Sequence, residues 1–553
     1  MARGNEAEAR SGGWVLPLIV LITGMFMSVL DTSIVNVAIP RMQSALGASS
    51  DDIAWVVTGY TLALGVVVPL SAWLSSRIGV TRLYLAALLG FTVASALCGM
   101  AWNLDSMVFF RILQAIPGGL LPVVSMTMLY RIVPPEKIGT AMGMYGLGVV
   151  FAPGVGPTLG GYLVEYVNWR LIFYINVPVG ILGAIAAAIV LPRVRPTTWP
   201  KFDFLGFLFI AYGLFALLLA TDKGQDWGWT SYPILILLVS SLISLALFVV
   251  IELEVEQPLL DLRVFKIWPY LNSLLLIGIL MIGLFSTLYY VPQFLQVTQG
   301  MEALDAGLVM MPSALVMTVM MPIAGRLYDK VGPRWPAVIG LIMTGVGSFL
   351  MAQITPDLPK EHLILWTVLR NIGVGLCMMP IMTGGLSALP PALTSAGSAM
   401  NNVMQRVSSS VGLAVFGGLI TAQQAQLFGD WGSQVDPSNA PSLSSAAGQG
   451  ASAAAQGASA AGHSAESLLP IYMQLQKNVV TASYANVFLA VTGLCAIGLL
   501  LALLLRSGRA KPAGGPPPAA APSRATAGEP AKEASPPPTQ REPEEPVSAG
   551  VHT

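Results

Sequence analysis

The sequence Ala72-Trp-Leu-Ser-Ser-Arg77-Ile-Gly79-Val-Thr-Arg82 has a near copy in the second half of the chain, Gly325-Arg-Leu-Tyr-Asp329-Lys330-Val-Gly332-Pro-Arg334. Each copy follows one long apolar segment and precedes another, so each reads as a short basic turn between two membrane spans. One such turn in each half indicates an internal duplication, an organisation that is typical of secondary transporters.

The composition is that of an integral membrane protein. Only 10% of the residues are charged and 54% are hydrophobic, and the mean hydropathy is +0.70, whereas roughly 25% of the residues in a soluble domain are charged. The net charge is zero and gives no indication of a nucleic-acid partner. Cys98, Cys377 and Cys495 lie in apolar segments without metal or redox spacing, so we expect small core residues, no metal and no cofactor.

Apolar runs of the length needed to cross a bilayer predict fourteen transmembrane helices and no strands. The predicted spans are residues 14 to 39, 54 to 74, 83 to 102, 106 to 130, 138 to 163, 171 to 191, 204 to 220, 232 to 251, 270 to 291, 306 to 325, 335 to 354, 362 to 384, 403 to 421 and 483 to 505. The predicted parts are a tail (1–13), a six-helix bundle (14–191), two inserted helices (203–251), a second bundle (268–505) and a final tail (506–553).

Basic residues predict the orientation. With the N-terminus in the cytoplasm, the inner connections hold fourteen Lys and Arg residues and the outer connections five, before the C-terminal tail is counted. Both termini are therefore expected to be cytoplasmic. The longest outer loop, 422–478, has a middle made mostly of Ser, Ala, Gly and Gln (442–461), which predicts flexibility, and the Pro-rich tail 506–553 predicts disorder.

The sequence lacks the motifs that would indicate ATP-driven transport or zinc-dependent catalysis. No lysine follows a glycine, so the phosphate loop G-x-x-x-x-G-K-[ST] is absent, and three histidines leave no H-E-x-x-H motif. We therefore expect an ion gradient to drive the protein, and no enzyme activity. Asp31 is the one carboxylate placed well inside a predicted span, where a charge costs at least a few kcal/mol. It is a candidate proton carrier, and a helix-packing aspartate bonded to a neighbour is the alternative.

Three arginines also lie within predicted spans. Arg111 shares a helix face with Gln114 and Gly118 by the i, i+3, i+7 spacing, which predicts a polar stripe facing the bundle interior. A guanidinium near Asp31 would favour the ionised carboxylate, so protonation would release the arginine and link proton uptake to conformation. Arg370 begins a similar stretch in the second half, and for Arg370 and Arg406 structural roles remain the alternative.

The fifth span carries small residues at every fourth position. These are Gly148, Ala152, Gly156 and Gly160, accompanied by Pro153, Pro157 and Gly161. Such a strip lets another helix approach closely, and the prolines supply kink points.

Together these motifs resemble the fourteen-span drug:proton antiporters of the major facilitator superfamily, the EmrB/QacA type, over about residues 14 to 505. Leu30-Asp31-Thr-Ser-Ile-Val-Asn36-Val-Ala-Ile-Pro40 resembles the first-helix motif, and Arg111 to Gly119 the fourth-helix motif. Gly143 with the strip of the fifth span resembles the antiporter motif, and Trp169-Arg170-Leu-Ile-Phe173-Tyr-Ile-Asn176-Val-Pro178 a further family stretch. Ser76, where many members carry an acidic residue, and Ala115 and Ala152, where glycine is usual, depart from the pattern.

The resemblance implies a major facilitator fold, with two six-helix bundles, two inserted helices and a substrate cavity at midplane. It implies that Asp31 is the proton site and Arg111 its coupling partner, with Asn36, Gln114 and Arg370 as candidates for the cavity. The basic turns would act in conformational gating, through Arg77, Gly79, Arg82, Gly325, Asp329, Lys330, Gly332 and Arg334.

We expect a multidrug exporter of small lipophilic compounds in the cell membrane, whose partners are substrate, protons and membrane lipid. A single intramembrane carboxylate favours neutral or anionic substrates over permanent cations. Met25, Met27, Met281, Tyr289, Tyr290, Met310 and Met311 could line a pocket, although core or lipid-facing positions are the commoner role of such residues. A dedicated exporter of a lipid or secondary metabolite fits the same motifs, whereas a channel or a membrane enzyme fits them less well. Some relatives of this type pass substrate to a periplasmic adaptor, and no outer segment here identifies a docking surface.

Overall fold

The computed structural model describes residues 13–192, 201–432 and 465–505, and within these ranges the chain is helical and contains no strand. The helices of the first half are α2 (Val15–Leu46), α3 (Ser50–Val67), α4 (Leu70–Ile78), α5 (Val80–Gly99), α6 (Leu104–Ile132), α7 (Ile138–Tyr166), α8 (Leu171–Tyr174) and α9 (Asn176–Val190). The inserted pair is α10 (Phe204–Trp227) and α11 (Tyr232–Glu254). The second half holds α12 (Trp268–Val297), α13 (Ala303–Val331), α14 (Arg334–Met351), α15 (Lys360–Ser387), α16 (Thr394–Gly432) and α19 (Ala465–Leu503). Three short 3-10 turns, Pro135–Lys137, Leu262–Lys266 and Pro391–Leu393, complete the described elements.

Thirteen of the described helices are long and apolar enough to cross a membrane, and α3 with α4 makes a fourteenth as a bent pair. The bend of 57° falls at Pro69, inside the stretch 54–74 that the sequence predicts as one span. Proline has no N–H to donate and its ring crowds the preceding turn, so the helix breaks there. The predicted all-helical membrane fold is confirmed.

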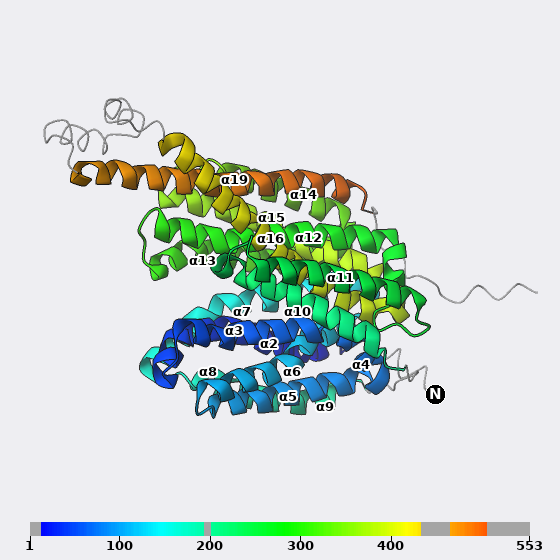
Figure 1. The fold of residues 1–553 in the computed structure, drawn as a ribbon. Helices are drawn as coiled ribbons and strands as arrows, with labels where there is room; N and C mark the ends of the chain where they lie inside the picture. Colours follow the sequence, from blue (N-terminus) through cyan, green and yellow to red (C-terminus); the bar gives the residue numbers. More distant parts are fainter. Residues whose placement is uncertain (1–12, 193–200, 433–464, 506–553) are drawn as a thin grey trace, which may run out of the picture. The chain divides into compact units, whose positions relative to one another are not determined.

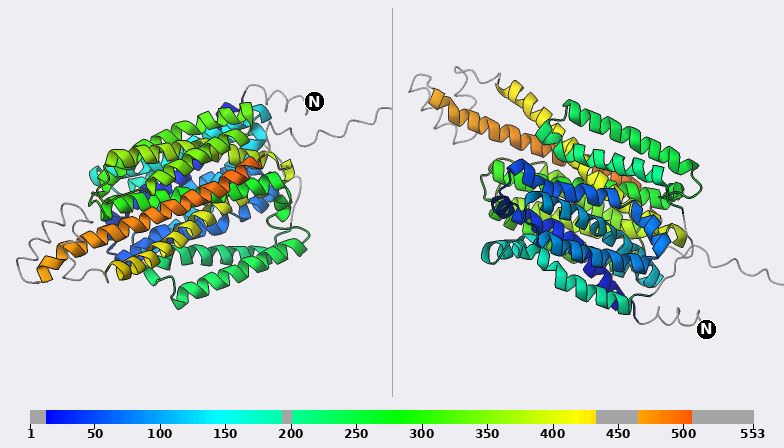
Figure 2. Two further views of the ribbon diagram at one scale, coloured as in Figure 1. Left: turned by 90° about the horizontal axis from the view of Figure 1, so that it is seen from above. Right: turned by 60° about the horizontal axis from the view of Figure 1, so that its bottom comes forward.

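The described helices form two groups with the inserted pair beside them. Helices α2 to α9 pack on one another, as do α12 to α19, and Figure 1 shows the two groups in blue to cyan and in green to orange. The pair α10–α11 lies along one flank, where α10 contacts both α3 and α16 (Figure 2). Large apolar side chains of α11 face outward, including Tyr232 at 83% and Leu242 at 72% exposure, as expected of a helix facing lipid.

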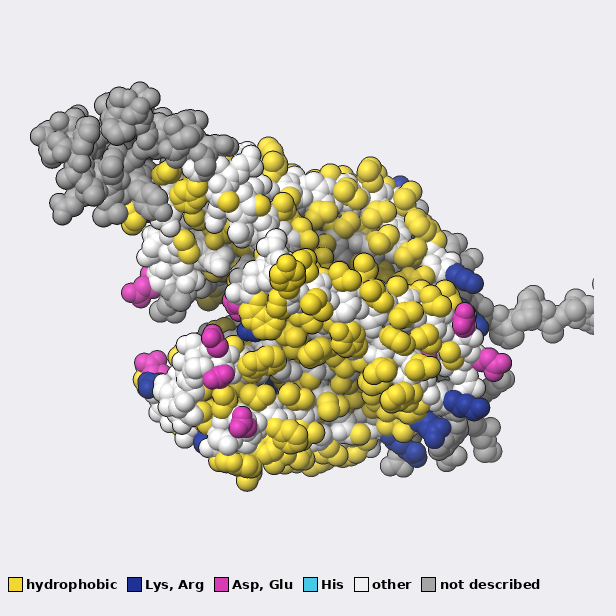
Figure 3. All heavy atoms as spheres, viewed as in Figure 1, with side chains coloured by type: hydrophobic (Ala, Val, Ile, Leu, Met, Phe, Trp, Pro, Cys, Tyr) yellow, Lys and Arg dark blue, Asp and Glu magenta, His cyan; other side chains and the backbone are white. Residues whose placement is uncertain are grey.

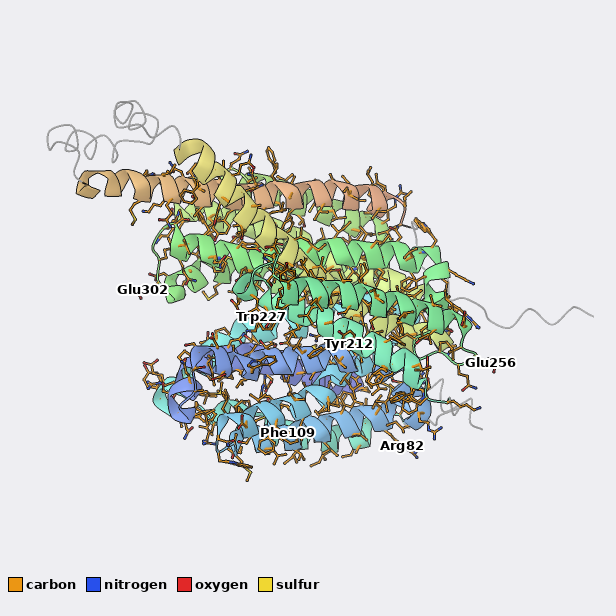
Figure 4. The ribbon with its side chains drawn as sticks, in the orientation of Figure 1. Arg82, Phe109, Tyr212, Trp227, Glu256 and Glu302 are labelled. Carbon is orange, nitrogen blue, oxygen red and sulfur yellow. The ribbon has the colours of Figure 1, made fainter. Side chains whose placement is uncertain are left out.

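The two basic turns lie at the same end of the helices, which we call the basic end. Gly79 and Gly332 both adopt positive φ angles, 88° and 81°, which only glycine reaches without strain, and this explains why both copies keep it. Arg82 lies at the basic end and Glu302 at the opposite end, as Figure 4 shows. Lys and Arg side chains gather at the basic end, and apolar side chains cover the middle of this face (Figure 3).

The hydrophobic core is continuous between the halves toward the basic end. One cluster of buried side chains combines Met142 and Tyr145 of α7 with Met321 of α13 and Met379 of α15. Toward the opposite end, separate clusters fill the first half, around Ile34 and Phe173, and the second half. The described structure is therefore closed between the halves at the basic end.

Two helices extend beyond their predicted spans into the segment 422–478. Helix α16 continues to Gly432 and α19 begins at Ala465, and the Ala- and Gln-rich sequence just after position 421 favours helix. The stretch 442–461 and the tails 1–12 and 506–553 lie outside the described residues.

Candidate functional site

Asp31 and Arg111 form a buried ion pair between α2 and α6. The Nη1 atom of Arg111 donates to Oδ2 of Asp31 at 2.5 Å, and the two side chains are 1% and 0% exposed. Both residues lie within long helices, away from the helix ends, and these helices contact each other directly. Arg111, which the family resemblance implies as the partner of Asp31, therefore lies against it in the structure.

Polar side chains from two further helices complete the surroundings of Asp31. Gln114 Nε2 donates to Oδ1 of Asp31 at 3.0 Å, and Asn176 Nδ2 of α9 donates to the same oxygen at 3.3 Å. Both amides also donate to the hydroxyl of Ser95 on α5, each at 3.1 Å. The oxygen of Gln114 accepts from Arg111 Nη1 at 2.8 Å. Four helices thus converge on one carboxylate.

Aromatic groups and backbone seal the pair. The guanidinium carbon of Arg111 lies 3.9 Å from the ring centre of Tyr60 on α3 and 5.7 Å from that of Phe173. Its Nε donates to the carbonyl of Val56 at 3.3 Å. Tyr60 and Phe173 are themselves buried, so Asp31 has no contact with solvent in this structure.

The donor set around Asp31 suits only the ionised carboxylate. Arg111, Gln114 and Asn176 all present N–H donors to it, and a protonated carboxyl would need an acceptor for its own O–H. Protonation would also remove the charge that Arg111 pairs with, in an environment where an unpaired buried cation is strongly unfavourable. The pair can therefore take up a proton only by rearranging.

The strip of small residues on α7 packs against α2 beside Asp31. A side chain at Gly156 would meet Ser33 at 2.5 Å, and one at Gly160 would meet the side chain of Ile34 at 2.8 Å. Gly148 faces Ile22 in the same way, Ala152 is buried, and Ser33 donates to the carbonyl of Pro153 at 3.2 Å. Pro157 is exposed, and Gly161 faces open space. The close approach predicted for this strip is thus made to the helix that carries Asp31.

The basic end of α7 is held by the second half. Asp329 accepts hydrogen bonds from the backbone N–H groups of Gly139 and Thr140, each at 2.8 Å, and from the hydroxyl of Thr140. A carboxylate at a helix N-terminus satisfies free N–H groups and interacts favourably with the helix dipole. Gly325 packs backbone to backbone on Gly139, so α7 and α13 touch with no side chain between them.

The first basic turn has no equivalent contact at the matching position. Ser76 donates to the carbonyl of Ala72 in its own helix, at 3.1 Å. Arg82 and Lys330 are exposed, Arg77 is partly exposed, and the guanidinium of Arg334 lies 5.9 Å from the ring of Trp335. The two turns share a backbone shape and differ in what they hold.

Two of the predicted cavity residues, Asn36 and Arg370, take no part in the hydrogen-bond network around Asp31. Asn36 is exposed on α2 and takes no part in the network around Asp31. Arg370 is fully buried and donates only to neutral oxygens, at 3.2 Å to Ser348, 3.3 Å to Asn371 and 2.6 Å to the carbonyl of Gly283. It therefore joins α15 to α14 and α12. The sequence alone does not connect Ser95, Asn176 or Tyr60 with the ion pair. Of these three residues, only Asn176 lies in one of the quoted motifs.

Comparisons with known proteins identify the family of the chain. The sequence model of the protein family "Major Facilitator Superfamily" matches residues 21–413 of this chain. The chain is 35% identical over 92% of its length to an uncharacterised MFS-type transporter, YhcA of Bacillus subtilis, of which it covers 96%. It is 31% identical over 78% of its length to a multidrug resistance protein B homolog of Mycobacterium tuberculosis, of which it covers 83%.

Two more comparisons extend the likeness. The chain is 30% identical over 78% of its length to the tetracenomycin C resistance and export protein of Streptomyces glaucescens, covering 82% of that protein. Among solved structures, the proton:xylose symporter XylE superposes with a TM-score of 0.56 at 13% identity, covering 91% of this chain and 98% of that one. That structural likeness shows the fold alone. The chain is a multi-pass membrane protein that belongs to the major facilitator superfamily.

Proposed function

We propose that this protein exports small lipophilic compounds in exchange for protons, with Asp31 as the proton carrier and Arg111 as its coupling partner. The observation that carries the proposal is the sealed pair, whose donors fit only the ionised form of Asp31. The names of the multidrug resistance and tetracenomycin export relatives support export of drug-like compounds. We infer that the basic end faces the cytoplasm, as the distribution of Lys and Arg predicts.

A continuous set of contacts can link Asp31 to the contact between Asp329 and α7 at the basic end. Ser33 and Ile34, just beyond Asp31 on α2, pack on Gly156 and Gly160 of α7. Helix α7 then runs to its basic end, where Asp329 holds it to α13. When Asp31 takes a proton, Arg111 loses its counter-charge and the packing of α2 must change. Because α7 lies against α2, such a change can reach the contact that keeps the halves closed, which is the switch that alternating access requires.

The second candidate is a dedicated exporter of one secondary metabolite. The tetracenomycin C export protein is the relative that favours it. The two candidates share the same coupling chemistry and differ only in the breadth of substrate.

The experiment uses purified protein in proteoliposomes with an acidic interior. Uptake of lipophilic dyes and drugs is measured together with proton efflux. The proposal expects uptake that depends on the pH difference and releases protons for each active compound. Several unrelated active compounds would favour the multidrug form, and a single active class the dedicated form. Uptake that continues unchanged after the pH difference is collapsed would contradict the proposal.

A further inference from the structure

A cavity lies where both groups of helices meet the inserted pair. It has a volume of about 220 Å³, and its walls come from α3 of the first half, from α12 and α16 of the second half, and from α10 with the turn that follows it. Among the described residues, neither Asp31 nor any member of the hydrogen-bond network around it lines this cavity. The cavity is therefore separate from the proposed proton site.

Asp222 of α10 is the charged residue among those that line the cavity. Its Oδ2 atom accepts a hydrogen bond from the hydroxyl of Thr58 on α3 at 2.9 Å. Asp222 takes part in none of the ion pairs within the described residues, and its neighbour Lys223 lies instead 3.5 Å from the carboxylate of Asp226. Arg406 of α16 does not line the cavity. The cavity wall thus carries a negative charge without a matching cation.

The chain around the end of α10 places an aromatic ring near this carboxylate. Helix α10 continues past the predicted end of its span to Trp227, labelled in Figure 4, and so carries Asp222 to the cavity. Gly228 then adopts a φ angle of 84°, which favours glycine. Just beyond it, the ring of Trp229 lies on Gly224, where the absence of a side chain leaves room for the ring. Trp229 is therefore held against the helix end that carries Asp222, and it also lines the cavity.

The other walls suit an apolar group that carries a positive charge. Tyr289 of α12 adds a second aromatic ring, and leucines of α3, α10 and α16 add apolar surface. Aromatic faces attract organic cations, and a carboxylate supplies the counter-charge that a cation needs when it leaves water. The cavity is smaller than the roughly 300–1,000 Å³ of pockets that enclose a drug-sized ligand. It therefore fits a cationic group with its adjoining carbons, and the rest of a larger compound would extend outside it.

We propose that the cavity between α3, α10, α12 and α16 binds the cationic group of the exported compound, with Asp222 as its counter-charge and Trp229 and Tyr289 as the rings that cover it. This inference rests on the proposed export function, and it makes the inserted helix α10 one wall of the substrate site. The sequence favours neutral or anionic substrates because it places Asp31 alone well inside a predicted span. Asp222 lies beyond such a span, and the fold brings it to the cavity.

Benzyltrimethylammonium and phenylmethanesulfonate test the charge preference, because they share a benzyl group and carry opposite charges. Binding of each ion to purified protein in nanodiscs is measured without a pH gradient, with empty nanodiscs correcting for partition into lipid. Native protein should bind the ammonium ion more tightly than the sulfonate. Asp222→Asn keeps an oxygen that can accept from Thr58 and removes only the charge, so it should weaken ammonium binding about tenfold or more. Asp222→Glu should restore much of it.

Two further variants separate the cavity from general effects of charge and packing. Asp51→Asn removes the same charge from an exposed position in the first turn of α3, outside the cavity, and should leave ammonium binding unchanged. Trp229→Leu should weaken ammonium binding about two- to fivefold, as loss of a cation–aromatic contact predicts, and Trp229→Phe should keep most of it.

Equal binding of the two ions by native protein, no ammonium binding, or ammonium binding that Asp222→Asn leaves unchanged would overturn the inference. The proposed function can fail separately. Ammonium binding that depends on Asp222, together with failed proton exchange, would refute the proposed function and leave this binding site standing. Proton exchange with neutral or anionic compounds, together with no ammonium binding, would leave the proposed function standing and overturn this inference.

Discussion

Asp329→Ala tests the contact that closes the basic end. In the structure this carboxylate accepts two backbone hydrogen bonds from the first turn of α7, and a third from the hydroxyl of Thr140. Hydrogen bonds to a charged group contribute about 1.5–3 kcal/mol, and a carboxylate at a helix N-terminus about 0.3–1 kcal/mol. In the open state Asp329 regains water, so a net loss of about 2–3 kcal/mol is expected, which shifts the equilibrium about 30- to 150-fold toward opening.

The assay is a distance distribution between spin labels at the basic end. Arg82→Cys in the first half and Ala392→Cys in the second place labels at exposed sites, and the three native cysteines are buried. Asp329→Ala should raise the fraction of long distances. Ser76→Ala is the matched control, because Ser76 occupies the same position of the other turn and bonds only within its own helix. Equal distributions for native protein and Asp329→Ala, or equal shifts in both variants, would refute the assignment of Asp329 as the closing contact.

Three further predictions concern the two buried arginines, Arg111 and Arg370, and the packing of α7 on α2. Arg111→Ala should lower the free energy of unfolding by about 3–5 kcal/mol, because it leaves Asp31 charged and buried, and adding Asp31→Ala should recover part of that loss in a thermal unfolding series. Gly156→Leu should drive α7 from α2 and abolish transport, while Gly161→Leu, which faces open space, should leave transport near the native rate, so equal losses would contradict the close-packing account. Arg370→Gln should lower the melting temperature but preserve transport per folded molecule, and a selective loss of transport would return Arg370 to the substrate path.

The sequence points to Asp31 and Arg111 because charged side chains are rare inside membrane spans. A carboxylate and a guanidinium inside apolar helices are costly, so Asp31 and Arg111 are conspicuous, and the helix periodicity adds Gln114. Ser95, Tyr60 and Asn176 are common residues for membrane helices, and only the fold shows that they meet at the pair. For the same reason, Arg370 looks like a second Arg111 in sequence. Its neutral partners come from α12, from α14 and from its own helix, and no local pattern reveals them.

The contact between α7 and α13 that closes the basic end is also only partly predictable from the sequence. The repeated turns and their glycines predict a duplicated gating device, and positive φ angles at Gly79 and Gly332 supply the physical reason for the repeat. The substitution of Ser76 for an acidic residue indicates asymmetry. That Asp329 caps α7 in the other half depends on the crossing of α7 and α13, which needs the tertiary structure.

The most direct test of the central claim compares two transport modes in the Asp31→Asn variant. Proton-driven uptake requires Asp31 to gain and lose a proton, whereas exchange of labelled for unlabelled substrate across the vesicle membrane requires no net proton movement. We expect Asp31→Asn to lose proton-driven uptake and to keep substrate exchange, whereas wild-type protein shows both. Proton-driven uptake that survives in this variant at the native rate would contradict it, and the proton would then have to be carried by another group.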